Sequence, residues 1–244
     1  MKLKIPLLYE DNHLLVVEKP VNMLSQGDST GDPDLLTVLK QKLKVKYQKP
    51  GNVYLGLVHR LDRPTGGVMV FAKTSKAAAR LSAQIQNRTF GRVYLAVVRG
   101  KIKPAQGILR HYLQKNKKTN LVTVVEKKKN GAKEAKLSYR VLATAANLSL
   151  VQVQLHTGRA HQVRVQFAAC GHPLFGDQRY GRTVNRPGRQ LALWAHAVSL
   201  DHPTLKKRMT FTSFPAQAQP WSQFADYLTA QRQKADLIKP VIMM

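Results

Sequence analysis

His59-Arg60-Leu61-Asp62-Arg63-Pro64-Thr65-Gly66-Gly67 is the stretch from which the rest of the chain can be interpreted. It sets one carboxylate among three residues that can carry positive charge, and then interrupts the backbone with proline and two glycines. Acidic residues are scarce in this chain, which has 13 Asp and Glu against 40 Lys and Arg. Positive neighbours favour the ionised form of a carboxyl group. Asp62 is therefore either a charged group at a site for a polyanion or one half of a structural ion pair with Arg60 or Arg63.

Composition narrows the class of protein and the class of its partner. A chain of 244 residues can form one large domain or two small ones, and an apolar content of 43% is that of a globular protein. The formal net charge of +27 concentrates polyanions at the surface. Nucleic acid is therefore the expected partner. An anionic membrane surface is the alternative, but no long basic amphipathic segment supports it.

Cysteine content and apolar runs indicate the compartment. Cys170 is the only cysteine, so neither an internal disulfide nor a cysteine-rich zinc site can form. The first residues reach Glu10 and Asp11 too early for the core of a signal peptide, and no apolar run approaches the length of a membrane span. We therefore expect a cytoplasmic protein without a membrane anchor.

The hydrophobic pattern predicts strands and helices that do not alternate regularly. Buried or half-buried strands are expected over residues 13–18, 68–72, 93–98 and 148–155. Helices are expected around residues 35–43, from Thr74 or Ser75 with Ala78, Leu81 and Ile85 on one face, and over about 161–169 with Gly171 as the C-terminal cap. Clustered strands without βα alternation favour an α+β fold, with a mixed, mostly antiparallel sheet and flanking helices.

Two further segments are a lysine-rich interval and the C-terminal tail. Residues 115–136 are rich in lysine and contain Asn130-Gly131, the favoured pair for a tight hairpin turn. A solvated hairpin is the first interpretation of this interval, and an arm that grips RNA is the second. Residues 222–244 form a C-terminal tail for which a short helix is expected.

The Asp62 stretch resembles the signature of the RluA family of RNA pseudouridine synthases, His-Arg-Leu-Asp-x-x-Thr-x-Gly. Four further blocks resemble the same family in the same order. They are the opening strand and Lys-Pro turn (9–20), the strand with the family's active-site tyrosine (91–100), Thr157-Gly158-Arg159-Ala160-His161-Gln162-Val163-Arg164, and Gly171-His172-Pro173-Leu174-Phe175-Gly176-Asp177. The resemblance runs from about residue 7 to about residue 215.

The resemblance implies a pseudouridine synthase fold with a central basic RNA-binding cleft. It implies site-specific isomerisation of uridine in structured rRNA or tRNA by base flipping. The reaction breaks the bond between ribose C1′ and uracil N1 and joins C1′ to C5, so it requires no cofactor and no metal. The sequence shows no Walker loop, dinucleotide-binding glycines or paired metal-ligand motif. We expect a two-lobed catalytic domain over residues 1–221, no separate small RNA-binding domain before it, and a monomer without an obligatory protein partner.

Three residues receive catalytic roles from the resemblance. Asp62 matches the catalytic carboxylate, which acts either as a nucleophile or as a base that takes a proton from the sugar. Arg164 matches the basic partner of that carboxylate, with an RNA-phosphate contact as the alternative. Tyr94 matches the tyrosine that stacks on the target uracil and helps to remove the C5 proton, with an ordinary core position as the alternative.

The remaining candidates are RNA contacts. A base inside a stem must be flipped out of the stack. Arg60 is expected to fill the vacated space or to contact a phosphate. The candidates for contacts with the RNA backbone are Lys19, Arg63, Arg159, His161 and Gln162.

The chain departs from the family pattern at four positions, none of them in the inferred catalytic triplet. Asn22 stands where many members have Gly after the Lys-Pro turn, and Arg92 replaces a common Lys. Gly66 stands where many members have Ser, and Trp194 stands where many have His. These departures suggest a branch of the family whose substrate cannot be assumed. Two other functions are alternatives to the enzyme. A non-catalytic RNA-binding or RNA-chaperone protein has no need of an acid facing phosphates, and a DNA-binding regulator would show a helix-turn-helix, zinc-finger or basic-zipper pattern.

Overall fold

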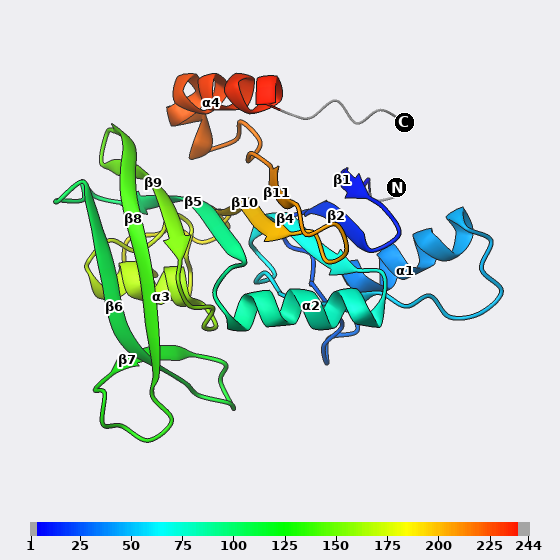
Figure 1. Cartoon of the computed structure of the whole chain (residues 1–244). Helices are drawn as coiled ribbons and strands as arrows, with labels where there is room; N and C mark the ends of the chain where they lie inside the picture. The colour runs from blue at the N-terminus through cyan, green and yellow to red at the C-terminus, as the bar shows by residue number, and fades with distance from the viewer. Residues whose placement is uncertain (1–3, 239–244) are drawn as a thin grey trace.

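One eleven-stranded sheet organises residues 4–238, which the computed structural model describes (Figure 1). The strands are β1 (Leu7–Glu10), β2 (Leu14–Lys19), β3 (Gly56–Leu57), β4 (Gly66–Ala72), β5 (Gly91–Arg99), β6 (Gln106–Lys115), β7 (Val122–Val125), β8 (Lys133–Ala145), β9 (Leu148–Leu155), β10 (Leu193–Asp201) and β11 (Arg208–Thr212). The helices are α1 (Leu35–Lys46), α2 (Ser75–Gln86), α3 (Gln162–Ala169), the short 3₁₀ helix η1 (Trp221–Phe224) and α4 (Ala225–Ile238).

The strand order is β1-β2-β4-β10-β5-β9-β8-β6-β7, with β11 added to β10 and β3 to β4. Every pairing between these strands is antiparallel except that of β4 with β10. The expected α+β fold with a mixed, mostly antiparallel sheet is confirmed.

Helices cover both faces of the sheet because its central strands are apolar on both sides. In β2, Leu15 and Val17 face a cluster that includes residues of α1 and α3, whereas Leu14 and Val16 face a cluster that includes α2. In β5, Leu95 and Val97 pack with η1 and α4. Figure 1 shows α1 at one end of the sheet and the β6–β7 strands at the other.

Local sequence signals place the helices. The Asp34 carboxylate accepts a hydrogen bond from Thr37 N (3.0 Å) at the start of α1, and the Thr74 hydroxyl accepts from Ala77 N (3.1 Å) at the start of α2. α3 ends before Gly171, which has the positive φ of 79° typical of a C-terminal cap. The three helices begin within one residue of their expected starts, and α1 extends three residues beyond the expected range.

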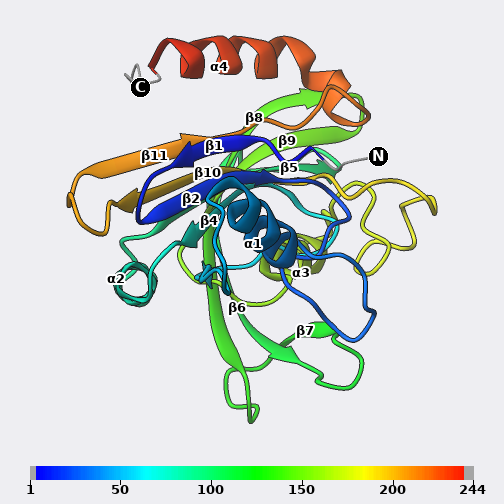
Figure 2. The same cartoon turned by 90° about the vertical axis from the view of Figure 1, so that its right-hand side faces the viewer.

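A tight turn forms at Asn130-Gly131, where Ala132 N donates to Lys129 O (3.1 Å) and Gly131 has a φ of +78°, but the expected hairpin across this turn is wrong. β6 pairs with β7 along one edge, through a turn over residues 116–121, and with β8 along its other edge. Asn130 and Gly131 therefore lie in a loop between two strands that are not neighbours. Strands β6–β8 carry residues 111–136 beyond the rest of the sheet (Figures 1 and 2), and we call this segment the lysine arm.

The C-terminal segment packs on the sheet. Trp221, Phe224 and Leu228 are buried against β5, β9 and β10. Helix α4 covers most of the tail for which a helix was expected, and residues 239–244 lie outside the described residues. None of the helices within residues 4–238 has the length and apolar content needed to cross a membrane.

Candidate active site

The Asp62 loop is fixed on both sides by hydrogen bonds to its backbone. The Ser25 hydroxyl donates to Leu61 O (2.7 Å) and accepts from Leu61 N (3.1 Å), just before the carboxylate. Just after it, Thr65 N donates to Asp62 O (3.0 Å) and closes a turn. The side-chain amide of Gln190 donates to Pro64 O (2.7 Å). The carboxylate is therefore presented by a backbone with few alternative conformations.

Gly66 and Gly67 allow β10 to run close beside this loop. A Cβ on Gly66 would lie 2.4 Å from the Trp194 ring, and a Cβ on Gly67 would lie 2.3 Å from Ala195 O. Gly67 also has a φ of +115°, which side chains rarely adopt. The departures from the family pattern at Gly66 and Trp194 are therefore in contact, because the missing side chain at residue 66 makes room for the Trp194 ring.

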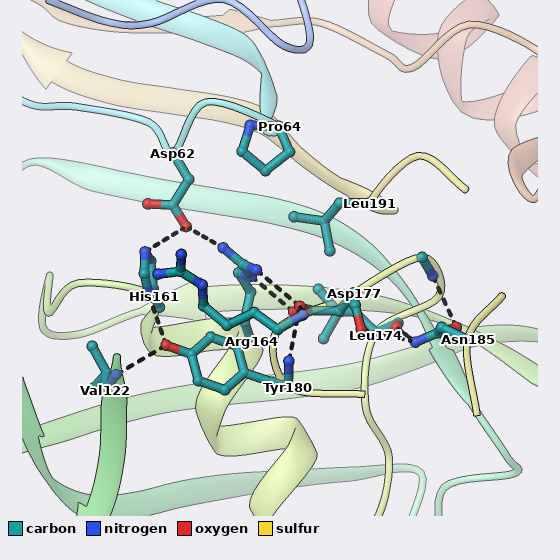
Figure 3. Close-up of polar contacts among 12 residues, drawn as sticks. Asp62, Pro64, Val122, His161, Arg164, Leu174, Asp177, Tyr180, Asn185 and Leu191 are labelled. Atoms are coloured by element: carbon teal, nitrogen blue, oxygen red, sulfur yellow. Dashed lines mark hydrogen bonds and ion pairs between the residues drawn. The ribbon is translucent and has the colours of Figure 1, made fainter. Parts of the chain in front are cut away.

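A chain of charges runs from Asp62 into the protein interior (Figure 3). Arg164 on α3 donates from Nη1 to Asp62 Oδ2 (3.3 Å). The same guanidinium donates from Nε and Nη2 to the two carboxylate oxygens of Asp177, each at 2.8 Å. Asp177 is 1% exposed, and its Oδ1 also accepts from the backbone of Arg179 and Tyr180. Asp177 therefore fixes the plane of the guanidinium, and the remaining Nη1 group of Arg164 contacts Asp62.

The interactions between these charged groups keep the side chains of Asp177 and Arg164 ionised. Burial opposes the charged form of Asp177, but the hydrogen bonds and the charge of Arg164 hold the pKa of its carboxyl below the ordinary value. Burial likewise opposes the charge of Arg164, and the two carboxylates raise its pKa. Asp62 thus faces a permanent cation with a fixed orientation, and its partner is neither Arg60 nor Arg63.

His161 lies beside the same carboxylate. Its Nε2 is 3.9 Å from Asp62 Oδ2, and its Nδ1 lies 2.7 Å from the Tyr180 hydroxyl (Figure 3). Burial lowers the pKa of this imidazole, with the charge of Asp62 acting in the opposite direction. Tyr180 in turn accepts a hydrogen bond from Val122 N of the lysine arm (3.1 Å). The arm is therefore connected to the site through a tyrosine and a histidine.

His59 supplies no positive charge to the signature stretch. Burial and the nearby charge of Arg92 lower the pKa of its imidazole to about 3. Its Nε2 accepts a hydrogen bond from Val70 N (3.0 Å), which requires an unprotonated nitrogen. His59 therefore ties the loop to β4 as a neutral group.

Tyr94 projects from β5 toward the Asp62 loop. Its residue pairs are Ala195 of β10 and Val153 of β9, so it lies in the middle of the sheet. Tyr94 is 8% exposed, and burial raises the pKa of its phenol to about 12. It lines two cavities together with Asp62. The side chain belongs both to the core and to the floor of the site.

A cavity of about 770 Å³ opens above Asp62 and Tyr94. Its rim carries five cationic side chains: Arg60, Arg63, Arg92, Lys115 and Arg159. A smaller space of about 60 Å³ continues below it, next to Leu193 and Val163. The structure therefore brings together Asp62, Tyr94 and Arg164, and it places Arg60, Arg63, Arg159 and His161 around the same cavity.

Two of the candidates for RNA contacts are wrong. Lys19 is fully buried, and its ammonium donates to Pro20 O (2.9 Å), Met23 O (2.6 Å) and Arg63 O (3.1 Å). Gln162 is 3% exposed, and its amide holds residues at the start of α3. Both side chains stabilise the loops around the site from the protein interior, because all their polar atoms are hydrogen-bonded to other residues.

The residues that support Asp62 and Arg164 carry no signal in the sequence. Asp177 ends a block that resembles the family, but its spacing from Arg164 gives no sign of a contact. Ser25 and Gln190 lie in loops without a motif. The residues that the structure describes contain no group of three His, Cys, Asp or Glu side chains placed to hold a metal ion.

Comparison with known proteins agrees with this geometry. A family model described as RNA pseudouridylate synthase matches residues 13–169, which include Asp62, Tyr94 and Arg164. The chain belongs to the RNA pseudouridylate synthase family. The expected membership is confirmed, and Asp177 lies beyond the matched segment.

Relatives and solved structures extend the match. The chain is 35% identical over 203 residues to an uncharacterised RNA pseudouridine synthase of Bacillus subtilis, covering 82% of this chain and 65% of the relative. It is 36% identical over 213 residues to the ribosomal large subunit pseudouridine synthase D of Nitrosomonas europaea, covering 82% and 58%. This chain thus spans about three fifths of the length of these relatives. The human RNA pseudouridylate synthase domain-containing protein 4 has the same fold, with a TM-score of 0.73 at 21% identity over 92% of this chain and 93% of that one.

Proposed function

We propose that this protein converts uridine to pseudouridine at a specific position of a structured RNA, with Asp62 as the catalytic carboxylate. The observation that carries the proposal is the position of Asp62. It lies at the floor of a basic cavity and is paired with an arginine whose orientation is set by a buried carboxylate. Membership of the pseudouridylate synthase family supports the same reaction.

The geometry of Asp62 suits either chemical role of the carboxylate. Arg164 and His161 both lie on the side of Oδ2, and no hydrogen bond or ion pair within residues 4–238 engages Oδ1. Oδ1 is the atom that attacks ribose C1′ or takes a proton from the sugar. After the bond from C1′ to N1 breaks, the uracil turns and C5 bonds to C1′. A bond from Asp62 to C1′ breaks as C5 joins, or a proton taken from the sugar is returned to it. The C5 proton then leaves and N1 takes up a proton, so atoms balance without an added reagent.

Tyr94 is proposed to support the flipped base. Its ring lines the cavity beside Asp62, where it offers an aromatic face to uracil. With a pKa of about 12 its hydroxyl is a neutral phenol near pH 7. This state favours stacking and hydrogen-bond donation over the removal of the C5 proton.

RNA is the proposed partner because the rim of the cavity is basic. Arg60 is exposed at that rim and is proposed to fill the space left by the flipped base, while Arg63, Arg159 and His161 contact the backbone. One relative is named as a synthase of the large ribosomal subunit, so we propose ribosomal RNA first and transfer RNA second. We further propose that the catalytic domain extends over residues 1–221 and acts as a cytoplasmic monomer.

The direct test is a pseudouridine map of total RNA from cells with and without the gene. The deletion strain is complemented with wild type or with Asp62→Ala. We expect one uridine that loses its modification in the deletion strain and regains it only with wild type. A map that is unchanged in the deletion strain, together with a purified protein that modifies no transcript, would show a binding protein instead.

A further inference from the structure

A second basic surface lies at the end of α1, away from the cavity over Asp62. Residues 35–61 contain no Asp or Glu, and α1 carries lysines at positions 40, 42, 44 and 46, followed by Lys49. Lys44 and Lys49 are exposed. The opposite side of the helix is anchored in the core through Leu35, Leu39 and Leu43. The lysines therefore form a fixed positive surface.

The carboxylate of Glu10 lies next to this surface and is fully engaged within the described part of the chain. Glu10 Oε1 accepts from Lys73 Nζ (2.9 Å) and from the Tyr47 hydroxyl (2.7 Å), and Oε2 accepts from Lys46 Nζ (2.7 Å). The Glu10 side chain is 8% exposed. It fixes the Tyr47 ring and the two ammonium groups, and its single charge is outweighed by theirs.

Two half-exposed aromatic rings lie beside these cations. Tyr47 is 44% exposed and Tyr54 is 50% exposed. They line a pocket of about 380 Å³ with Lys49, Lys73 and the side-chain amides of Asn12 and Asn52. The Tyr54 hydroxyl lies against Gly56, where an added Cβ would approach within 2.9 Å. The hydroxyl edge of this tyrosine therefore lies close to the backbone of β3, and half of its surface stays exposed.

We propose that the pocket formed by Tyr47 and Tyr54 is a second RNA-binding site, which holds an unpaired nucleotide of the substrate outside the reactive stem-loop. The base stacks on Tyr54, an asparagine amide contacts its edge, and Lys49 binds the adjoining phosphate. This proposal rests on the proposed function. The pocket shares no residue with the cavity over Asp62, so one RNA that fills both is held at two separate points.

The test compares three proteins, which are wild type, one double variant of the pocket and one control variant, on two RNAs. The double variant Tyr54→Leu, Lys49→Gln keeps apolar volume and removes the aromatic face and the charge. Its control is Lys76→Gln, Lys101→Gln, which removes two exposed lysines elsewhere. Each protein is measured with a long transcript around the mapped uridine and with the minimal stem-loop. The readouts are Kd at two salt concentrations and the single-turnover rate at saturating RNA.

We expect the double variant to bind the long transcript about tenfold more weakly than wild type, and its saturating rate to stay within about twofold. On the minimal stem-loop the two proteins should have equal affinity, because that RNA does not reach the pocket. The control should fall within about twofold of wild type on both RNAs. Equal affinity of wild type and double variant for the long transcript overturns the proposal and leaves an acidic protein as the occupant to examine.

The two proposals fail differently. If wild type forms pseudouridine and the double variant binds the long transcript normally, only the second site is wrong. If Asp62→Asn still modifies the mapped uridine at the wild-type rate but the double variant binds the long transcript more weakly, the second site stands and the assignment of Asp62 is wrong.

Discussion

The charged residues near Asp62 and those of the lysine arm differ in almost every physical respect. Arg164 has an 8% exposed side chain and ion pairs with Asp62 and Asp177. The arm carries lysines at positions 115, 117, 118, 127, 128, 129, 133 and 136, most of them exposed, and none is in an ion pair among the described residues. The charges around Asp62 are few and paired with each other. The lysines of the arm are many and unpaired among the described residues.

The difference separates chemistry from affinity. A buried ion pair is held in one geometry and is screened weakly by salt, so it can orient a reacting group. Exposed lysines release counterions from phosphates and give affinity that falls with salt. Substitutions in the buried chain should therefore change the rate of reaction, and substitutions in the arm should change the affinity for RNA.

The largest effect is expected for Arg164→Met. The change leaves Asp177 buried without its cation and removes the partner of Asp62. We expect the free energy of unfolding to fall by about 3–5 kcal/mol and the single-turnover rate to fall at least about 10³-fold. Urea denaturation and a product assay measure the two quantities. Arg164→Lys, which keeps the charge without the two-pronged contact, should fold more stably and remain slow.

Asp177→Asn should separate positioning from binding. The amide keeps the volume of the carboxyl but presents an NH₂ group to one arm of the Arg164 guanidinium. We expect the saturating rate to fall by about 10–100-fold with Kd for RNA unchanged, because Asp62 loses its orientation. A parallel loss of affinity, or an unchanged rate, would show that Asp177 does not position the catalytic group.

The lowered pKa of Asp177 predicts that the stability difference between wild type and Asp177→Asn depends on pH. The pKa of Asp177 is lower in the folded protein than in the unfolded chain, so its ionisation stabilises the fold at every pH above the unfolded value of about 3.9. This stabilisation is lost as pH falls through the lowered folded pKa. The difference in unfolding free energy between wild type and Asp177→Asn should be constant from pH 7 to about 5 and shrink below about 4. If the difference in unfolding free energy changes between pH 7 and pH 5, the pH dependence comes from another titrating group.

Tyr94 lies between the two regions in function, because it contributes both to the core and to the site. Tyr94→Phe keeps the ring, and its rate should stay within about tenfold of wild type. Tyr94→Leu removes the stacking face, and its rate should fall at least about 100-fold. Single-turnover assays at saturating RNA distinguish the two. Equal, large losses in both variants would show that the hydroxyl carries the chemistry.

The smallest effect on rate is expected in the arm. Replacing Lys117, Lys118, Lys128 and Lys129 together by Gln should weaken RNA binding about tenfold at moderate salt and reduce the slope of log K against log[salt]. The saturating rate should stay within about twofold of wild type. Titrations at several salt concentrations provide the slope. An unchanged slope would leave the first interpretation of this segment, a solvated hairpin.

Sequence predicted the α+β sheet, the three long helices before the tail and the convergence of Asp62, Tyr94 and Arg164, because each depends on local pattern or on a motif. The contact of Arg164 with Asp177 depends on how a loop after α3 folds back, which no spacing reveals. Lys19 ends an apolar strand and resembles a surface charge, but three carbonyl oxygens meet around it only in the folded chain. The pairing of β8 with β6 likewise depends on which edge of β6 is free.

The most direct test of the account is to measure RNA affinity and product formation on one preparation of Asp62→Asn beside wild type. The RNA is an in vitro transcript that carries the uridine identified by the map. The account predicts a Kd within about threefold of wild type and a single-turnover rate lower by at least about 10⁴-fold. A variant that forms pseudouridine within about tenfold of the wild-type rate would contradict the assignment of Asp62 as the catalytic carboxylate.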